Sequence, residues 1–197
     1  MRRRMTRAYR PDAVPSDVLR SLVELAARAP SAGKTQGWHL VVLDGGAQTR
    51  FWNVTLPPDD RAGFPWPRLL EAPVIALPLA DPLAYVERYS AADKASSGLG
   101  RGTEYWPAPY WTVDTAMAVN TFLLAAEDAG LGALFFGVFS GESELRAELG
   151  IPEHLQLLGA IALGYSADPS PRAHRPQSTP TRPRRRPPEQ ILHRGAW

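Results

Sequence analysis

Pro30-Ser31-Ala32-Gly33-Lys34-Thr35-Gln36-Gly37-Trp38 connects a segment with helical periodicity to a short apolar segment typical of a β-strand. Within nine residues it offers hydroxyls, an amide, a cation, two glycines and a tryptophan. Hydrogen-bond donors, accessible backbone and a flat apolar ring occur together where proteins bind ligands. We therefore expect the loop 30–38 to be a binding surface that its two neighbouring elements hold in place.

The elements on both sides of this loop are predicted from the spacing of apolar residues. Between positions 18 and 29 these residues recur on one face of a helix, and Pro30 ends that helix because proline lacks the amide donor. After the loop, residues 39–43 are mostly aliphatic and β-branched, which predicts a buried strand.

The same reasoning predicts the remaining elements. Strands are expected at 73–79, 133–139 and 155–165, and helices at 47–54, 83–91, 111–129 and 143–149. The prolines of the strand 73–79 are expected to border it, because proline cannot donate to a strand ladder. Segment 56–67 is rich in proline and is expected to be an irregular surface excursion. The elements are too few for a doubly wound sheet, so we predict a three-layer α+β fold.

Composition limits the class of protein. The 197 residues are 44% hydrophobic and 21% charged with a net charge of +2, which favours one globular domain and does not favour nucleic-acid binding. The chain has no cysteine, so disulfides and thiolate chemistry are excluded and a cytoplasmic location fits. The four histidines lack ligand spacing and no apolar run is long enough to span a bilayer, so we expect neither a metal site nor a membrane partner.

Arginine is concentrated at the two ends of the chain, within the first ten residues and again after position 171. Because residues 168–197 are rich in both proline and arginine, they cannot form an ordinary core element. We predict a core of residues 1–166 and an extended arm of residues 167–197 that belongs to the same domain. The two basic clusters are either solvated tails, parts of one site for an anionic ligand, or nucleic-acid-binding arms whose affinity would fall steeply with salt.

Four large aromatic residues lie just before the predicted helix 111–129 or at its first position, namely Tyr105, Trp106, Tyr110 and Trp111. A single loop cannot place all four in a small core, so we expect part of the group to form a lid or a pocket wall. The glycines at 98–102 do not lie between a strand and a helix, which argues against a dinucleotide-binding fold.

Five segments occur in a characteristic order: Arg3-Arg4-Met5-Thr6-Arg7-Ala8-Tyr9, the loop 30–38, Gly130-Leu131-Gly132, Ile151-Pro152 with Leu163-Gly164-Tyr165, and the basic ending 184–192. Together they resemble the FMN-dependent nitroreductase family over nearly the whole chain. The resemblance implies an α-β-α sandwich with a mostly antiparallel central sheet and a C-terminal arm exchanged in a homodimer. It also implies an oxidoreductase that takes hydride from NAD(P)H and passes it through FMN to a small aromatic acceptor such as a nitroaromatic or a quinone.

The resemblance also assigns roles to individual residues. The terminal arginines would bind the FMN phosphate, Arg7 would face the pyrimidine edge of the flavin, and the loop would reach the flavin from the opposite subunit. Gly137 and Val138 would present backbone near the flavin N5, although a bulge in a core strand is an equally good interpretation of Gly137. The implied cofactor-binding set is Arg3, Arg4, Met5, Arg7, Pro30, Ser31, Ala32, Lys34, Gln36, Phe136, Gly137, Val138, Arg184 and Arg186. The implied acceptor pocket is formed by Tyr105, Trp106, Tyr110 and Trp111, and no protein side chain is implied as catalytic.

Three positions depart from the family pattern. Lys34 stands where asparagine is usual, Gly37 where proline is usual, and Met5 where serine is usual. These departures leave open a divergent relative: a flavin-binding or storage protein without turnover, or an enzyme with dehalogenase, flavin-cleaving or deazaflavin-dependent chemistry.

Overall fold

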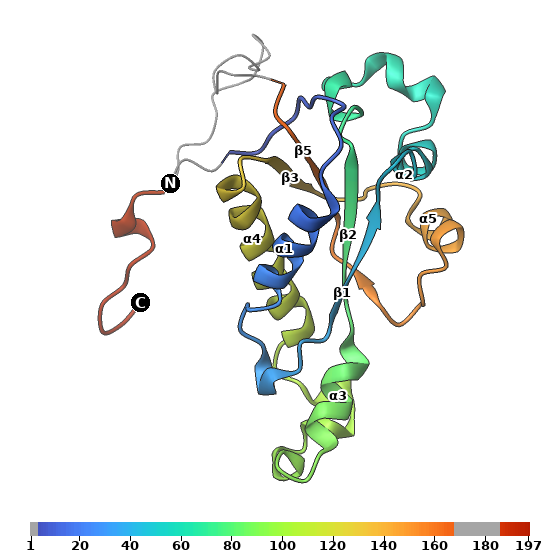
Figure 1. The fold of residues 1–197 in the computed structure, drawn as a ribbon. Helices are drawn as coiled ribbons and strands as arrows, with labels where there is room; N and C mark the ends of the chain where they lie inside the picture. Colours follow the sequence, from blue (N-terminus) through green and yellow to red (C-terminus); the bar gives the residue numbers. More distant parts are fainter. Residues whose placement is uncertain (1–3, 168–185) are drawn as a thin grey trace.

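The computed structural model of the chain describes residues 4–167 and 186–197. Its centre is a five-stranded sheet with the order β1-β2-β5-β3, in which a short strand, β4, also pairs with β2 (Figure 1). The pairs between these strands are antiparallel. The strands are β1 (Trp38–Leu43), β2 (Val74–Ala80), β3 (Gly132–Phe136), β4 (Gln156–Leu157) and β5 (Ala160–Gly164).

Helices cover both faces of the sheet. One face packs against α1 (Ser16–Ala26) and α4 (Tyr110–Asp128), and the other packs against α2 (Gln48–Thr55) and α5 (Glu142–Leu149) (Figure 1). Helix α3 (Pro82–Ser90) follows β2 and extends beyond the end of the sheet. This arrangement confirms the predicted three-layer α-β-α sandwich.

The two faces arise from alternation along the strands. In β2, Ile75 and Leu77 belong to the core beneath α2, whereas Val74 and Ala76 belong to the core beneath α1 and α4. Every residue of β2 and of β5 is buried. Because successive side chains of a strand point to opposite faces, strands that are buried throughout need cover on both sides.

Most predicted elements are confirmed to within one residue at their ends, including the long helix, which was expected at 111–129 and spans Tyr110–Asp128. The helix before Pro30 ends earlier than predicted, at Ala26. The strand predicted at 133–139 ends at Phe136, so Gly137 lies just outside the sheet.

Two predictions about the sheet are wrong, and they share one cause. Pro78 lies inside β2 and does not border it, and the strand predicted at 155–165 is split into β4 and β5. The backbone amide of Leu158 donates to the carbonyl of Pro78 at 3.1 Å. In an antiparallel sheet, the backbone amide and carbonyl of one residue point to the same neighbouring strand. The amide hydrogen that Pro78 lacks would therefore point to Leu158–Gly159, where β4 and β5 are separated and no strand pairing is lost. The proline is tolerated because the ladder is already interrupted there.

Gly159 makes this interruption possible. Its φ of +139° is rarely adopted by other residues, and a Cβ at this position would lie 2.5 Å from the carbonyl oxygen of Phe136 on the adjoining strand. Both the backbone angle and the space require glycine.

We therefore expect Gly159→Ala to lower the free energy of unfolding by about 2–4 kcal/mol, as judged by chemical denaturation. Gly45→Ala is the matched control, because Gly45 also has a positive φ, of +54°, but nothing within 4 Å of a built Cβ. The control should cost about 1 kcal/mol through backbone strain alone. Equal losses in the two variants would contradict the close contact with Phe136.

Candidate functional site

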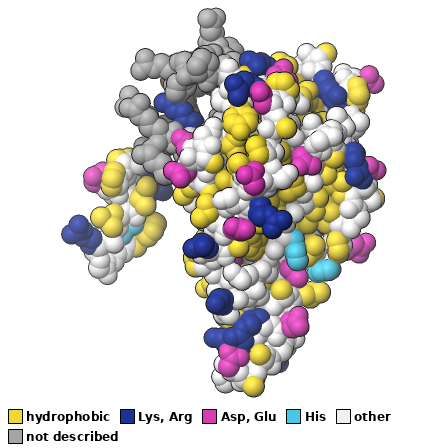
Figure 2. Space-filling view, in the orientation of Figure 1, with side chains coloured by type: hydrophobic (Ala, Val, Ile, Leu, Met, Phe, Trp, Pro, Cys, Tyr) yellow, Lys and Arg dark blue, Asp and Glu magenta, His cyan; other side chains and the backbone are white. Residues whose placement is uncertain are grey.

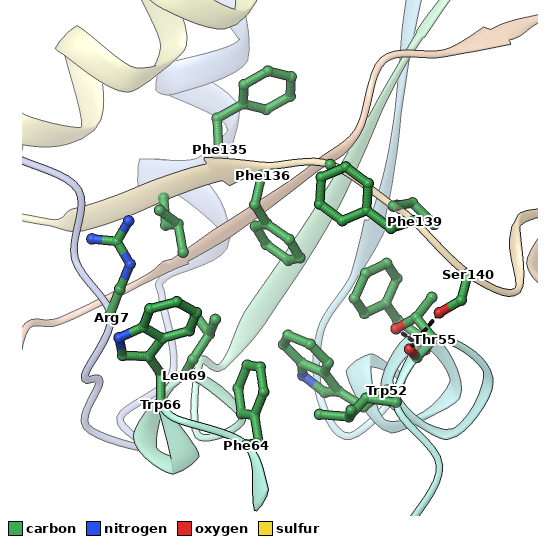
Figure 3. Close-up of a pocket in the computed structure, with 15 residues that line it drawn as sticks. Arg7, Trp52, Thr55, Phe64, Trp66, Leu69, Phe135, Phe136, Phe139 and Ser140 are labelled. Carbon is green, nitrogen blue, oxygen red and sulfur yellow. Dashed lines mark hydrogen bonds between the residues drawn. The ribbon is translucent and has the colours of Figure 1, made fainter. Parts of the chain in front are cut away.

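A cavity of about 310 Å³ lies between the end of β3, helix α2 and the segment 64–69 (Figure 3). Its volume is at the lower end of the range for small-molecule sites, about 300–1,000 Å³. Aromatic and aliphatic side chains dominate the walls, and the lining residues are Arg7, Phe51, Trp52, Thr55, Leu56, Phe64, Trp66, Leu69, Leu134, Phe135, Phe136, Gly137, Val138, Phe139 and Ser140.

Flat rings form the inner wall of the cavity. The rings of Trp52 and Phe136 are nearly parallel, with an interplanar angle of 4° and centroids 5.9 Å apart, and Phe51 meets both edge-on. The indole N–H of Trp52 is buried behind this wall and has no hydrogen-bond partner among the described residues. An unpaired buried donor is costly, so this position is not optimised for stability alone.

Arg7 is the one charged residue among those that line this cavity. Its guanidinium lies over the Trp66 ring, 5.2 Å from the centroid (Figure 3). A cation held against an aromatic face beside an apolar cavity is suited to a planar ligand that carries partial negative charge.

The chain on either side of Arg7 is bound to the sheet. The Thr6 amide donates to the Ala133 carbonyl at 3.1 Å, and the Tyr9 hydroxyl lies 3.0 Å from the carbonyl oxygens of Thr6 and Ala162. Burial raises the pKa of Tyr9 well above its usual range, so its hydroxyl remains a donor. These contacts fix Arg7 at the end of the sheet where β2 begins.

Gly137 and Val138 line the cavity directly after β3, as their predicted role requires. A Cβ on Gly137 would lie 2.7 Å from the ring of Phe139, so a larger residue would displace that ring. Phe139 itself is 97% exposed. The backbone at Gly137 and Val138 is therefore presented at the cavity rim.

The loop 30–38 lies elsewhere in the chain, before β1 and next to α3 (Figure 1). Its backbone is unusual, because Gly33, Lys34 and Gln36 have φ values of +61°, +57° and +53°. Lysine and glutamine rarely adopt such angles, and strained residues of this kind persist only where the surroundings hold them. The Lys34 side chain is exposed.

Hydrogen bonds hold the loop on several sides. Ser31 Oγ accepts from the Gln36 amide at 3.0 Å, and the Gln36 side chain donates to the Ala27 carbonyl at 2.8 Å. Arg88 of α3 donates to the Gly33 carbonyl at 3.0 Å. The Ala32 amide donates to the carboxylate of Asp114 on α4 at 2.7 Å.

Tyr105, Trp106, Tyr110 and Trp111 do not line the described cavity. Trp106 is buried against Tyr85 and Tyr89 of α3, and its indole N–H donates to the Leu99 carbonyl at 3.0 Å. Tyr89 also lies next to the loop 30–38, because a Cβ built on Gly33 would lie 2.8 Å from its ring. Trp106 and its neighbours therefore adjoin that loop through Tyr89. Tyr105 and Tyr110 are partly exposed there, at 43% and 39%.

Of the predicted phosphate-binding arginines, Arg3 and Arg184 lie outside the described residues. Arg4 is described and exposed, and the adjacent Met5 forms a bridge with Ala133. Arg186 is exposed at the start of the C-terminal segment 186–197, where it donates to the Gln190 carbonyl.

The sequence did not identify the cavity walls formed by Trp52, Phe64 and Trp66. Trp52 lies in the helix expected at 47–54, to which no site role was assigned, and Phe64 and Trp66 lie in the segment that was expected to be a surface excursion. They are partly buried and pack against the core instead. The two aromatic residues in this proline-rich segment could have indicated that it forms part of a cavity wall.

The visible surface carries basic and acidic side chains intermixed, without a continuous basic stripe over the described residues (Figure 2). In the same part of the chain, no helix combines the length and the apolar character needed to cross a bilayer. No group of three or more histidine, aspartate or glutamate side chains gathers as a metal site within the described ranges.

Residues 1–58 and 60–165 match the family model described as Nitroreductase family. The chain is 30% identical over 193 residues to an NADH dehydrogenase of Thermus thermophilus, with 89% of this chain and 88% of that protein covered. It is 31% identical over 189 residues to Nitroreductase NfnB of Mycolicibacterium smegmatis, with 84% and 80% covered.

Solved structures show the same fold. A nitroreductase-like protein from Streptococcus mutans matches with a TM-score of 0.71 and 16% identity, over 97% of this chain and 93% of that one. An FMN-dependent nitroreductase from Clostridium difficile matches with a TM-score of 0.60 and 21% identity, over 86% of each chain. The chain belongs to the nitroreductase family of flavin-type NAD(P)H oxidoreductases.

Proposed function

We propose that the chain binds FMN in the aromatic cavity beside β3 and transfers hydride from NADH or NADPH to a small aromatic acceptor, such as a nitroaromatic or a quinone. The observation that carries this proposal is the cavity itself. It combines an inner wall of stacked aromatic rings, Arg7 as the one cation among its lining residues, and the backbone of Gly137 and Val138 at its rim.

The residues present fit a flavin. A planar tricyclic ring needs flat apolar walls, and its pyrimidine edge carries carbonyl acceptors. The stacked rings of Trp52 and Phe136 offer such a wall, and Arg7 offers donors at the same cavity. Arg4 and Arg186 would supply guanidinium groups to the phosphate, together with Arg3 and Arg184, which lie outside the described residues.

Bound FMN would supply the hydride-accepting and hydride-donating N5 atom. The chain's own residues would bind the cofactor and orient its ring. Arg7 would place a positive charge beside the ring, which would stabilise its reduced form, and the aromatic wall would exclude water from one ring face. The backbone at Gly137 and Val138 would lie at the rim through which NAD(P)H and the acceptor would enter in turn.

We further propose a homodimer in which the loop 30–38 completes the partner's site. The loop precedes β1 at one edge of the sheet, whereas the cavity lies beside β3 at the other edge. Three strand spacings separate these edges, or about 14 Å, so one chain does not bring its own Arg7 and Lys34 to the same ring. The segment 186–197 carries Ile191, Leu192 and Trp197 exposed at 61%, 59% and 99%, which supports an arm that is covered by a second subunit.

Cofactor loading is the first test. The purified protein should bind about one FMN per chain, turn yellow, and lose the flavin absorbance when NADH or NADPH is added without oxygen. Oxidation by a quinone or a nitroaromatic should restore the colour. A protein that stays colourless after incubation with FMN contradicts the proposal, and one that binds FMN without being reduced rapidly is a flavin-binding protein without turnover.

The role of Arg7 is tested by Arg7→Gln. Loss of the positive charge should lower the reduction potential of the bound FMN by roughly 30 mV or more, since about 30 mV corresponds to 1.4 kcal/mol for a two-electron couple. Arg10→Gln is the matched control on the same segment, because Arg10 packs over Tyr165 and pairs with Asp12 away from the cavity. Equal FMN reduction potentials in the two variants would show that Arg7 does not act on the flavin.

Mixed dimers test whether the site is shared. Arg7→Gln and Lys34→Glu subunits should each bind FMN poorly alone, whereas statistical mixing should restore about a quarter of the wild-type sites, because half the dimers are mixed and each has one intact site. FMN absorbance per chain of the co-expressed mixture, purified through one tag that both subunits carry, measures this. If mixing restores nothing, the two residues act in the same chain or not at all.

A further inference from the structure

We propose that Asp114 is a positioning residue for the cofactor site: its carboxylate holds the Ala32 amide and thereby keeps the loop Ser31–Gln36 in the conformation that binds FMN. This inference rests on the proposed function, in which that loop contacts the flavin. Asp114 itself is not among the residues that line the cavity, and its carboxylate accepts hydrogen bonds from Ala32 and Tyr85.

One carboxylate oxygen makes both of the contacts on which the inference depends. Asp114 Oδ2 accepts from the Ala32 amide and from the Tyr85 hydroxyl, each at 2.7 Å. Asp114 is only 6% exposed and Tyr85 only 1%. The carboxylate therefore joins three parts of the chain at one atom: the loop, α3 and α4.

The partner Tyr85 is a fixed donor. Its ring is packed edge-on against Trp106 and Trp111. Burial, and in addition the hydrogen bond and charge of Asp114, raise the pKa of Tyr85 far above its usual range, so the hydroxyl keeps its proton. The aromatic group around Trp106 thus has a structural role: it sets the position of the Tyr85 hydroxyl.

Burial of the Asp114 carboxylate does not favour the stability of the fold by itself. Within residues 4–167 and 186–197, Asp114 has no ion pair with an arginine or lysine. Burying such a charge is unfavourable unless strong hydrogen bonds offset the loss of water. Two short charge-assisted bonds do so here, and one of them goes to the loop.

The loop needs this restraint because its backbone is strained. Lys34 and Gln36 hold positive φ angles without being glycine, so the loop in isolation would favour other conformations. Ser31 Oγ and the Gln36 side chain restrain its C-terminal half, and Arg88 restrains the Gly33 carbonyl. Asp114 provides the bond to the Ala32 amide, and it does so from a buried position on the longest helix.

The direct test is Asp114→Asn, which keeps the shape and removes the charge. If the conformation that binds FMN becomes about tenfold less populated, the apparent Kd for FMN rises about tenfold, in inverse proportion to that population. Hydrogen–deuterium exchange of the apo protein should accelerate at the amides of residues 32–36, while the rest of the chain keeps its protection. Asp128→Asn, at the exposed end of the same helix, is the matched control and should change neither quantity.

A second variant separates positioning from general support of the fold. Tyr85→Phe removes one donor to Asp114 and keeps the ring, so it should raise the Kd by a smaller factor, about threefold, and the double variant should fall short of the product of the two effects. A Kd within twofold of wild type in Asp114→Asn, or faster exchange throughout the molecule in that variant, would overturn the proposal.

The outcomes also distinguish this inference from the proposed function. If the wild-type chain binds no FMN, the proposed function fails, and the claim that Asp114 prepares an FMN site fails with it. If the wild type binds FMN and the Asp114→Asn loop exchanges at the wild-type rate, the proposed function stands and only the role of Asp114 is rejected.

Discussion

The constraint that shapes this molecule is the complete burial of β2 and β5. Every side chain of these two strands is buried, on both faces of the sheet. Helices must therefore cover both faces, and little of the sheet surface remains for a ligand. What remains lies at the two edges: an aromatic cavity beside β3, and the strained loop that leads into β1.

This division explains why the two candidate binding surfaces do not meet in one chain. Arg7 and Gly137 belong to one edge, and Ser31 and Lys34 belong to the other. A second copy of the chain would be the simplest way to join them, because a two-fold axis would bring the loop of each copy to the cavity of the other, as proposed above. Each edge is held by its own buried polar side chain, Tyr9 behind the cavity and Asp114 behind the loop.

Sequence reasoning predicted the layers and most element ends, because apolar periodicity reports burial directly. It also selected the loop 30–38 from its composition. It was wrong about Pro78 and the strand after Leu155, because the direction in which a missing amide would point is set by strand pairing, which the sequence does not show. It did not single out Asp114, although this residue is the one charged side chain in the stretch 111–126, which was a usable signal. Of the aromatic residues 105–111, which were expected to wall a pocket, Trp106 and Trp111 pack edge-on against Tyr85 within one chain.

The central claim is that one flavin site is formed by the cavity of one chain and the loop of another. A crystal structure of the protein grown with FMN tests it most directly. The account predicts the flavin ring between Arg7 and the backbone of Gly137 and Val138 of one chain, with Ser31 and Lys34 of the second chain in contact with the same cofactor. A flavin bound by a single chain, or bound away from the Trp52–Phe136 wall, would contradict it.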